Sequence, residues 1–295
     1  MKIPTRFAAA VAAVSMVAVT AACGSSTETA KPETSKADAK IRAMLPADVR
    51  DKGVLNVASD VPYPPFEFYD TDGKTVIGMD PDLGKAIGDV LGLTLTFNAV
   101  SFESMIPSLK SGKYDVLFTG MSDTPERQKE VTFVDYLQTG GSLMIKDGST
   151  TRPGSLEELC GLTVGAQSAT IIVDYLEGVI APECAKDAQL KLSQFTGQDD
   201  LVQALRSGRV DVAVIPSPSA GYIVKTTKNE FELTFTLPFG ILGIAVPKGS
   251  DKLAAAFEAA LQKLIDDGTY TKTLTKYGLE KLALDKATTN AGTAS

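Results

Sequence analysis

The chain contains one short pattern twice, and this repetition limits the folds open to it more than any other feature. Residues 106–118 (IPSLKSGKYDVLF) and 202–214 (VQALRSGRVDVAV) agree at Leu, Ser, Gly, Asp and Val positions, and Lys or Arg flanks the glycine in both. Each copy is typical of a helix that ends at a glycine and leads into a buried strand. So common a unit can recur by chance. The interpretation we favour is two lobes built on one plan, with a cleft between them.

Helical and extended patterns alternate through the chain. Asp80 followed by Pro81 predicts an N-cap and a first helical residue, and apolar residues then recur on one helical face. Strands are expected at residues 54–58, 93–97, 115–119, 162–166, 212–215 and 241–246. This alternation predicts an α/β fold, with parallel sheets covered by helices.

The composition excludes several classes of function. The 295 residues include no histidine, no tryptophan and three cysteines. A Ser-His-Asp or Cys-His catalytic pair, a zinc site with histidine and a four-cysteine site are therefore excluded. The acidic balance, 36 Asp+Glu against 29 Lys+Arg, argues against a nucleic acid partner. Neither a metal nor a cofactor is expected, whereas chemistry based on carboxylates, Lys or Tyr stays open.

The N-terminus has the pattern of a secretory signal. Lys2 and Arg6 are the only charges before an apolar run over residues 7–22, so residues 1–22 are predicted to be a signal peptide. The alternative is a short membrane anchor, although such a span needs roughly 20 residues. The sequence Thr20-Ala-Ala-Cys23 resembles the lipobox of bacterial lipoproteins, with Thr where Leu is usual, which implies that Cys23 is lipidated. Cleavage there shifts the formal net charge from −7 to −9.

Two segments are predicted to be flexible. Residues 24–40 contain no aromatic or branched apolar side chain, so we expect residues 23–45 to form a tether between the lipid on Cys23 and the folded body. Residues 285–295 are similarly small and polar and are expected to be a flexible tail.

The two remaining cysteines form a candidate disulfide. Cys160 and Cys184 are 24 residues apart, and a secreted chain experiences an oxidising environment. A bridge of this loop length would contribute roughly 3 kcal/mol in the chain-entropy account. The alternative is a pair of buried free thiols.

A candidate anion site follows the strand at residues 115–119. Thr124 is a suitable N-cap for a short helix, and free N–H groups at a helix N-terminus favour anions. Arg127 lies in that first turn, where a cation opposes the helix dipole. Its position is explained if it faces a bound carboxylate. The alternative is that Arg127 pairs with Glu126 or Glu130 on a solvated face.

Three further places carry candidate binding residues. Thr170 is a possible N-cap after the strand at 162–166. The helix that it begins would present a second N-terminus to the cleft, and the alternative is that Thr170 is an ordinary cap without a binding role. The proline-rich loop 60–68 is stiff and presents Asp60 and Tyr63, whereas its phenylalanines are expected to cover the core. Phe102 and Glu103 offer another aromatic ring and carboxylate after a strand.

Four motifs together resemble a known family. They are DVPYPPFEF (60–68), IGMDPDL (77–83), SFESMIPSLKSGKYDVLFTGMSDTPERQKEVTFVDYL (101–137) and DDGTYTKTLTKYG (266–278). Residues 48–282 are similar to the polar-amino-acid-binding proteins of bacterial ABC importers, solute-binding family 3. The resemblance implies a bilobal, type II periplasmic-binding-protein-like clamshell, in which two crossing segments join the two α/β lobes. Lobe 1 would comprise residues 46–138 and 242–284, and lobe 2 residues 139–241.

The resemblance also implies roles for individual residues. Arg127 matches the arginine that pairs with the ligand α-carboxylate. The other matches are Thr119, Gly120 and Ser122 for the carboxylate and amino groups, Tyr63 and Phe102 as aromatic walls, Asp60 for a cationic end, and Thr170 and Ile171 for the carboxylate in the second lobe.

The sequence departs from the family at two positions. Family members often have an Asp that binds the α-ammonium where this chain has Pro216, and the usual Gly near Ala169 is absent. The first departure weakens the expectation of an ordinary free α-amino acid; the alternatives are that Ser122 and backbone carbonyl groups hold the ammonium, or that the ligand carries a substituted amine. Asp60, Glu103 and the aromatic residues favour a cationic or polar-aromatic ligand.

The expected function is therefore that of a lipid-anchored, monomeric, extracytoplasmic protein that binds an amino acid or a derivative and delivers it to an ABC permease. We expect hinges near residues 137–141 and 238–243 and no enzymatic activity. The alternative is a dehydratase-like enzyme of the same fold that acts on prephenate-like acids with Glu103 or Asp60 as the acid.

Overall fold

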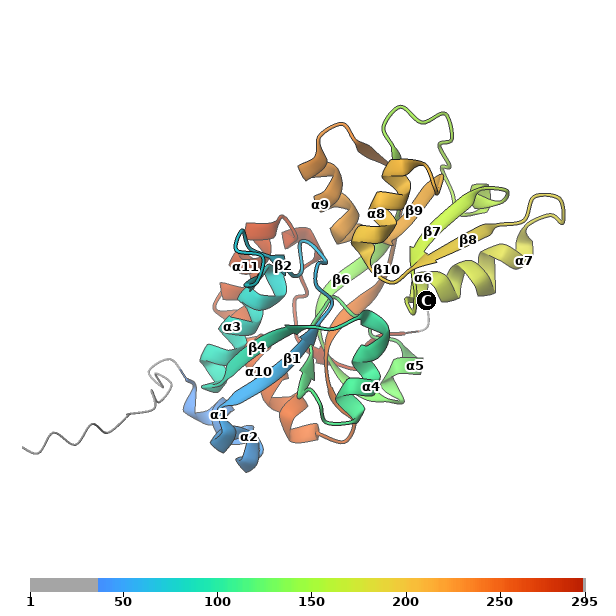
Figure 1. Cartoon of the computed structure of the whole chain (residues 1–295). Coiled ribbons are helices and arrows are strands. Elements are labelled where there is room, and N and C mark those ends of the chain that lie inside the picture. Colours follow the sequence, from blue (N-terminus) through green and yellow to red (C-terminus); the bar gives the residue numbers. More distant parts are fainter. Residues whose placement is uncertain (1–36, 294–295) are drawn as a thin grey trace, which may run out of the picture. The chain divides into compact units, whose positions relative to one another are not determined.

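Two long antiparallel strands run through both halves of the molecule (Figure 1). The computed structural model describes residues 37–293. In it β6 (Val131–Lys146) pairs with β10 (Phe231–Pro247) along nearly their whole lengths. They lie at the centre of a nine-stranded sheet with the order β4-β1-β5-β10-β6-β9-β7-β8, and β11 pairs with β6 off this path.

The other strands are β1 (Val54–Ser59), β2 (Phe68–Tyr69), β3 (Val76–Ile77), β4 (Thr94–Ala99), β5 (Val116–Leu117), β7 (Thr163–Gln167), β8 (Lys191–Phe195), β9 (Val212–Pro216) and β11 (Thr288–Thr289). The α-helices are α1 (Ala39–Met44), α2 (Ala47–Lys52), α3 (Met79–Leu91), α4 (Met105–Lys110), α5 (Pro125–Gln128), α6 (Ile171–Tyr175), α7 (Ala181–Glu183), α8 (Gln198–Ser207), α9 (Ser217–Thr227), α10 (Asp251–Asp266) and α11 (Thr269–Tyr277). A π-helical turn (Leu176–Ile180) joins α6 to α7, and 3₁₀ turns occur at Phe102–Ser104, Glu157–Leu159 and Glu280–Leu282.

Each half of the sheet has its own three parallel strands. In lobe 1 these are β4, β1 and β5, and in lobe 2 they are β8, β7 and β9. Each half also has a buried apolar cluster on either side of the sheet, so each buries a core of its own. The predicted α/β, bilobal fold with two crossing segments is confirmed, and the crossing segments are β6 and β10.

The repeated sequence pattern corresponds to a repeated structural unit. Both copies end their helix at a glycine with positive φ. The aspartate that follows then ties the next strand to its neighbour: Asp115 Oδ2 accepts from the backbone N–H of Asn56 at 2.7 Å, and Asp211 Oδ2 from that of Thr163 at 2.8 Å. The same bond in both lobes explains why this aspartate occurs in both copies.

The predicted start of α3 was wrong by two residues. The helix begins at Met79, and its N-cap is Gly78 rather than Asp80. Gly78 has φ +138°, and a Cβ there would lie 2.2 Å from the carbonyl oxygen of Phe66, so the turn requires glycine. Asp80 is instead fully buried and accepts a hydrogen bond from the backbone N–H of Gly120.

Part of the predicted tether is ordered. Residues 39–44 form α1, which Asp38 caps by accepting from the N–H groups of Lys40 and Ile41. Arg42 donates to the carbonyl oxygen of Leu91 at 2.8 Å and so docks α1 on α3. The predicted signal peptide and Cys23 lie outside the described residues.

The predicted flexible tail is docked on lobe 1. Its β11 pairs with β6, and Asn290 Oδ1 accepts from the backbone N–H of Phe133 at 2.8 Å. The N–H of Gly292 donates to Asp123 at 2.7 Å. Composition alone missed this because small polar side chains, backbone groups and the single buried Ala287 make the contacts. The predicted lobe boundaries fall within β6 and β10 and stay predictions.

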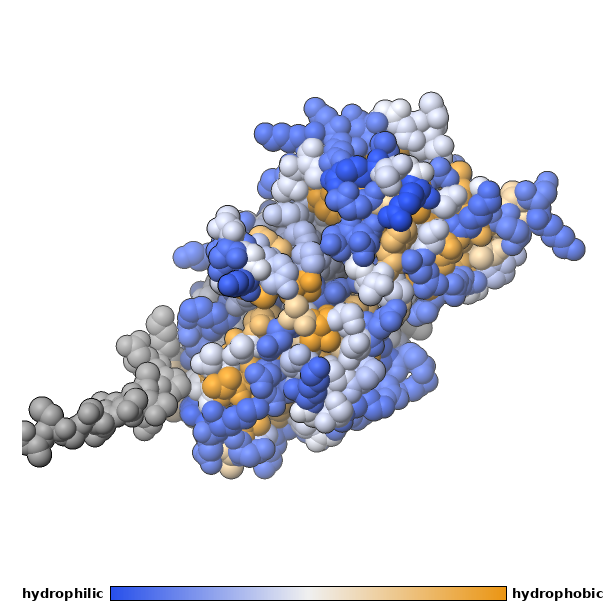
Figure 2. Space-filling view, in the orientation of Figure 1, coloured by the Kyte–Doolittle hydropathy of each residue, from blue (hydrophilic) through white to orange (hydrophobic). Residues whose placement is uncertain are grey.

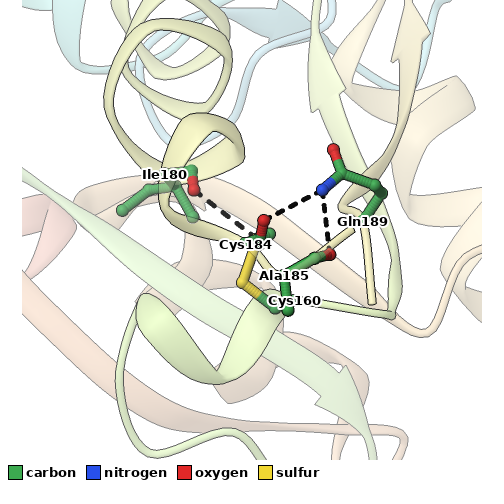
Figure 3. The surroundings of a disulfide bond; sticks show 5 residues. All are labelled: Cys160, Ile180, Cys184, Ala185 and Gln189. Atoms are coloured by element: carbon green, nitrogen blue, oxygen red, sulfur yellow. Dashed lines mark hydrogen bonds between the residues drawn. A yellow bond between two sulfur atoms is a disulfide. The ribbon is translucent and has the colours of Figure 1, made fainter. Parts of the chain in front are cut away.

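The predicted disulfide is present in lobe 2 (Figure 3). It joins Cys160, just after a 3₁₀ turn, to Cys184 at the end of α7, with their Cα atoms 5.4 Å apart. Gln189 donates to the carbonyl oxygens of Cys184 and Ala185, both at 2.9 Å. The bridge thus anchors the short helices after α6 to the edge of the lobe.

The surface offers no extended apolar area on the face shown in Figure 2, where apolar residues reach solvent only in small separate groups. Among the helices of residues 37–293, none is both long and apolar enough to cross a membrane. The same residues contain no group of three or more Cys, Asp or Glu side chains suited to hold a metal ion.

Candidate functional site

A small cavity lies where loops from both lobes meet the crossing strands. Seven of the predicted ligand residues line it: Tyr63, Phe102, Gly120, Ser122, Arg127, Thr170 and Ile171. Its other lining residues, which the sequence did not single out for this role, are Thr139, Gly140, Gln167, Ile172, Pro216 and Leu242. The cavity holds about 30 Å³ of water-accessible space, so its walls must separate to admit a solute.

Arg127 bridges the two lobes. Its backbone N–H is capped by the hydroxyl of Thr124 at 3.3 Å, as predicted. Its guanidinium donates to the carbonyl oxygen of Ser122 at 2.9 Å and to that of Ala169, in lobe 2, at 3.0 Å. The same group lies 5.4 Å from the centre of the Phe102 ring. Carbonyl oxygens are weaker partners for a guanidinium than a carboxylate is, so a bound carboxylate could replace them.

The alternative that Arg127 pairs with a neighbouring glutamate does not hold. Glu126 pairs with Lys129, and Glu130 pairs with Lys110. Burial lowers the pKa of Arg127 to about 10, which still leaves the guanidinium charged at neutral pH. The chain therefore maintains a positive charge at the wall of the cavity.

The loop before α6 is strained at Ala169. This residue has φ +60°, a left-handed conformation that only glycine adopts without steric cost. Thr170 is the N-cap of α6, but its hydroxyl donates back to the carbonyl oxygen of Gln167 at 2.7 Å and leaves the helix N–H groups free of a side-chain cap. The strained residue is thus the one whose carbonyl oxygen accepts from Arg127. Strained backbone is often found at functional sites.

Asp60 faces the same loop from lobe 1. It is 8 % exposed, and Gln167 Nε2 donates to its Oδ2 at 2.6 Å. Burial is the main cause that raises the pKa of Asp60 to about 6, opposed by the hydrogen bond from Gln167 and aided by the negative charge of Asp199. Among the described residues no Lys or Arg pairs with this carboxylate, so a cationic ligand would supply the missing charge.

Three predicted ligand residues do not line the cavity, and one of them is Asp60, which contacts the lining residue Gln167. Thr119 is fully buried, donates to Glu67 and accepts from the backbone N–H of Asp60 at 2.9 Å, so it holds the Asp60 loop in place. Glu103 is exposed on the turn at Phe102–Ser104. Tyr63 does face the cavity, and its ring stacks on Phe66 with centres 5.0 Å apart.

A pair of buried acids supports the floor of the cavity. Asp80 Oδ2 accepts from the N–H of Gly120 at 3.1 Å and from the hydroxyl of Tyr136 at 3.2 Å. The negative charge of Asp80 also raises the pKa of Glu67, so ionisation of both carboxyl groups at once is disfavoured. Burial is the main cause that raises the pKa of Asp80 to about 7 and the pKa of Glu67 well above its usual range.

Comparison with known proteins identifies the family. Residues 55–280 match the bacterial extracellular solute-binding proteins, family 3. The chain belongs to this family. It is 31% identical to the arginine-binding protein ArgT of Corynebacterium glutamicum, over 85% of this chain and 83% of that protein. Family membership agrees with the position of the cavity between two α/β lobes.

Two solved structures extend the comparison. An ancestral arginine-binding protein bound to arginine is 35% identical, with a TM-score of 0.70 over 77% of this chain and 98% of that one. An ancestral amino acid-binding protein described as a precursor of cyclohexadienyl dehydratase is 30% identical, with a TM-score of 0.69 over 78% and 97%.

Ala169→Gly should stabilise the protein by about 1 kcal/mol, because glycine adopts the left-handed conformation without the steric cost that alanine bears. Urea unfolding measures the change. Ala185→Gly, in an exposed loop of the same lobe where φ is negative, is the matched control and should stabilise nothing. A loss of stability in Ala169→Gly would contradict the strain argument.

The buried acids should make stability depend on pH. Because the folded-state pKa values of Asp80 and Glu67 lie above their unfolded values, folding retains protons that the unfolded chain releases. The free energy of unfolding should therefore fall as the pH rises from about 4 to about 8.

Asp80→Asn should reduce this fall by about 1–3 kcal/mol in urea titrations at several pH values. Asp82→Asn, on the exposed side of the same helix, is the control and should leave the fall largely unchanged. Equal slopes in wild type and Asp80→Asn would refute the assignment.

Proposed function

We propose that the chain is the substrate-binding component of a bacterial ABC importer and captures a small solute that carries a carboxylate and a cationic end, an amino acid or a derivative of one. The observation that carries this proposal is the pair of opposite charges facing one lobe 2 loop. Arg127 contacts Ala169, and Asp60 contacts Gln167, two residues earlier. A solute with both charges would replace both contacts. The names of the relatives, which specify arginine, support the same class of ligand.

Capture is proposed to occur by closure of the lobes about β6 and β10. The pairing of these strands shifts register between Pro238 and Ile241 and again between Leu242 and Gly243, within the predicted hinge. Such irregularities bend a strand pair locally. Opening must break the hydrogen bonds from Arg127 to Ala169 and from Gln167 to Asp60. A solute bound between the lobes would pair with Arg127 and Asp60 instead, and would therefore favour the closed state.

The dehydratase alternative lacks support among the described residues. Glu103 is outside the cavity, and Asp60 has no second acid or base opposite it among the lining residues. A general acid needs a partner base and a positioned substrate. Binding without turnover is therefore the proposed function.

Arg127→Ala should weaken binding by about a hundredfold or more, because it leaves a buried carboxylate without its charge partner. Isothermal titration calorimetry with L-arginine and with desamino-arginine, the same molecule without its α-amino group, measures the loss. Lys129→Ala, an exposed residue just after the same helix, is the matched control and should bind like wild type. Circular dichroism should show that both variants fold. An Arg127→Ala affinity within threefold of wild type would refute the anion site.

We also propose that the mature chain is a monomer anchored at Cys23 by lipid on the outer side of the cell membrane. The support is the lipobox-like sequence, together with the extracellular description of the family. Palmitate labelling should mark the wild type, and Cys23→Ser should lose the label and leave the membrane fraction. Cys160→Ser is the control for general cysteine loss and should keep the label. A Cys23→Ser protein that stays membrane-bound would contradict the anchor.

A further inference from the structure

The protein places one cationic and one anionic side chain at the cavity, so it can pair with two charged groups of a solute. Arg127 is the only ionisable cation or acid among the lining residues, apart from the phenol of Tyr63. Asp60 adds one carboxylate through its contact with Gln167. The described site therefore offers one positive and one negative partner. L-Arginine carries three charges: a carboxylate, a guanidinium and an α-ammonium.

The nearby acids are committed elsewhere. Glu67 and Asp80 lie beneath the floor, where Glu67 accepts from the hydroxyl of Thr119 and Asp80 accepts from the N–H of Gly120. Asp123 accepts from the side chain of Gln128 and from the N–H of Gly292 in the docked tail.

Asp174 and Glu126 line a separate groove on the outer side of α5 and α6. Asp174 lies near enough to Arg127, and Asp199 near enough to Asp60, to raise the pKa of each partner, but neither acid is among the lining residues. The cavity lining, as the described residues form it, thus contains no carboxylate.

Pro216 occupies the place where a second acid could stand. It ends β9, which runs parallel to β7, so it lies beside the loop with Ala169 that Arg127 contacts. Proline provides neither a charge nor an N–H group. Ile172 and Leu242 complete an apolar part of the lining. An α-ammonium enclosed here would lose its hydration without a counter-charge, which is costly.

The neutral polar groups fit a hydrogen-bonding ligand better than a third charge. Thr139, on β6 at the hinge, lines the cavity and is 6 % exposed. Its hydroxyl has no partner within the part of the chain that the structure describes. A buried hydroxyl without a protein partner is available to a ligand atom or a water molecule. A hydroxyl can hydrogen-bond a guanidinium, a carboxylate or an ammonium, but it supplies a counter-charge to none of them.

We propose that this site recognises a carboxylate and a distant cation and does not recognise a charged α-amino group, so that its solute class is ω-guanidino or ω-amino carboxylic acids without a free α-ammonium. The inference rests on the proposed function and narrows it. It departs from the amino acid named for the relatives, because the charges of this cavity, rather than the family, decide which groups are bound.

Calorimetry on the wild-type protein tests the inference with L-arginine, desamino-arginine and agmatine, which is arginine without its carboxylate. We expect desamino-arginine to bind at least as tightly as L-arginine and agmatine to bind at least tenfold more weakly. L-Arginine binding more than threefold tighter than desamino-arginine would overturn the inference and leave the proposed function intact. If neither of these two binds, the proposed function fails together with it.

A designed acid provides the second arm. Pro216 is the N-cap of α9, a position where Asp is favourable, so Pro216→Asp should fold. The new carboxylate should raise the ratio of L-arginine affinity to desamino-arginine affinity by about tenfold or more.

Pro46 is likewise an N-cap proline, on α2, and Pro46→Asp is the matched control that should leave the ratio unchanged. An unchanged ratio in folded Pro216→Asp would contradict the role assigned to this position. The wild-type comparison stands whether or not the variant folds.

Discussion

The hydrogen bonds of Arg127 to two carbonyl oxygens are the contacts on which the rest of the site depends. One oxygen belongs to Ser122 in lobe 1 and the other to Ala169 in lobe 2. Burying a guanidinium costs free energy that neutral oxygens only partly return. The Thr124 cap and the strained Ala169 fix both ends of the bridge. The resting contact is thus weaker than the one a carboxylate would make, which gives a ligand the difference in affinity needed to favour closure.

The sheet explains how so small a contact can control two lobes. Each lobe buries its own apolar clusters on both faces of its strands, so neither needs the other for its core. Only β6 and β10 run through both, and their pairing is irregular near Gly243. In the proposed closure, the lobes would rotate about this pair, and the polar contacts at the cavity would then contribute to the balance between open and closed forms.

The sequence predicted the fold and seven of the residues that line the cavity, because repeats, helix caps and family motifs leave a recognisable pattern in the sequence. Helix–glycine–strand repeats indicated two similar lobes, and the cap at Thr124 indicated where Arg127 would point. Gln167 and Thr139 were missed because neutral polar residues in strands follow no rule of spacing. Asp60, Thr119 and Glu103 lie outside the cavity lining, because position after a strand locates a residue but does not determine where its side chain points. The docked tail was missed because small polar side chains and a short strand, which leave no apolar pattern in the sequence, make its contacts.

The acid pair under the floor bears on which solutes the site can hold. Two ionised carboxylates beneath Gly120 would attract a second cation, whatever the cavity wall offered. Burial raises the pKa of Asp80 to about 7 and that of Glu67 well above its usual range, which reduces that negative charge at neutral pH. The hydroxyls of Thr119 and Tyr136 and the N–H of Gly120 are directed at what remains of it. Asp60 reaches the cavity through the lining residue Gln167, and Asp80 lies against it through the N–H of the lining residue Gly120. Of these two carboxylates only Asp60 faces the lobe 2 loop that Arg127 contacts, so a solute with a single cationic group satisfies the carboxylate at that loop.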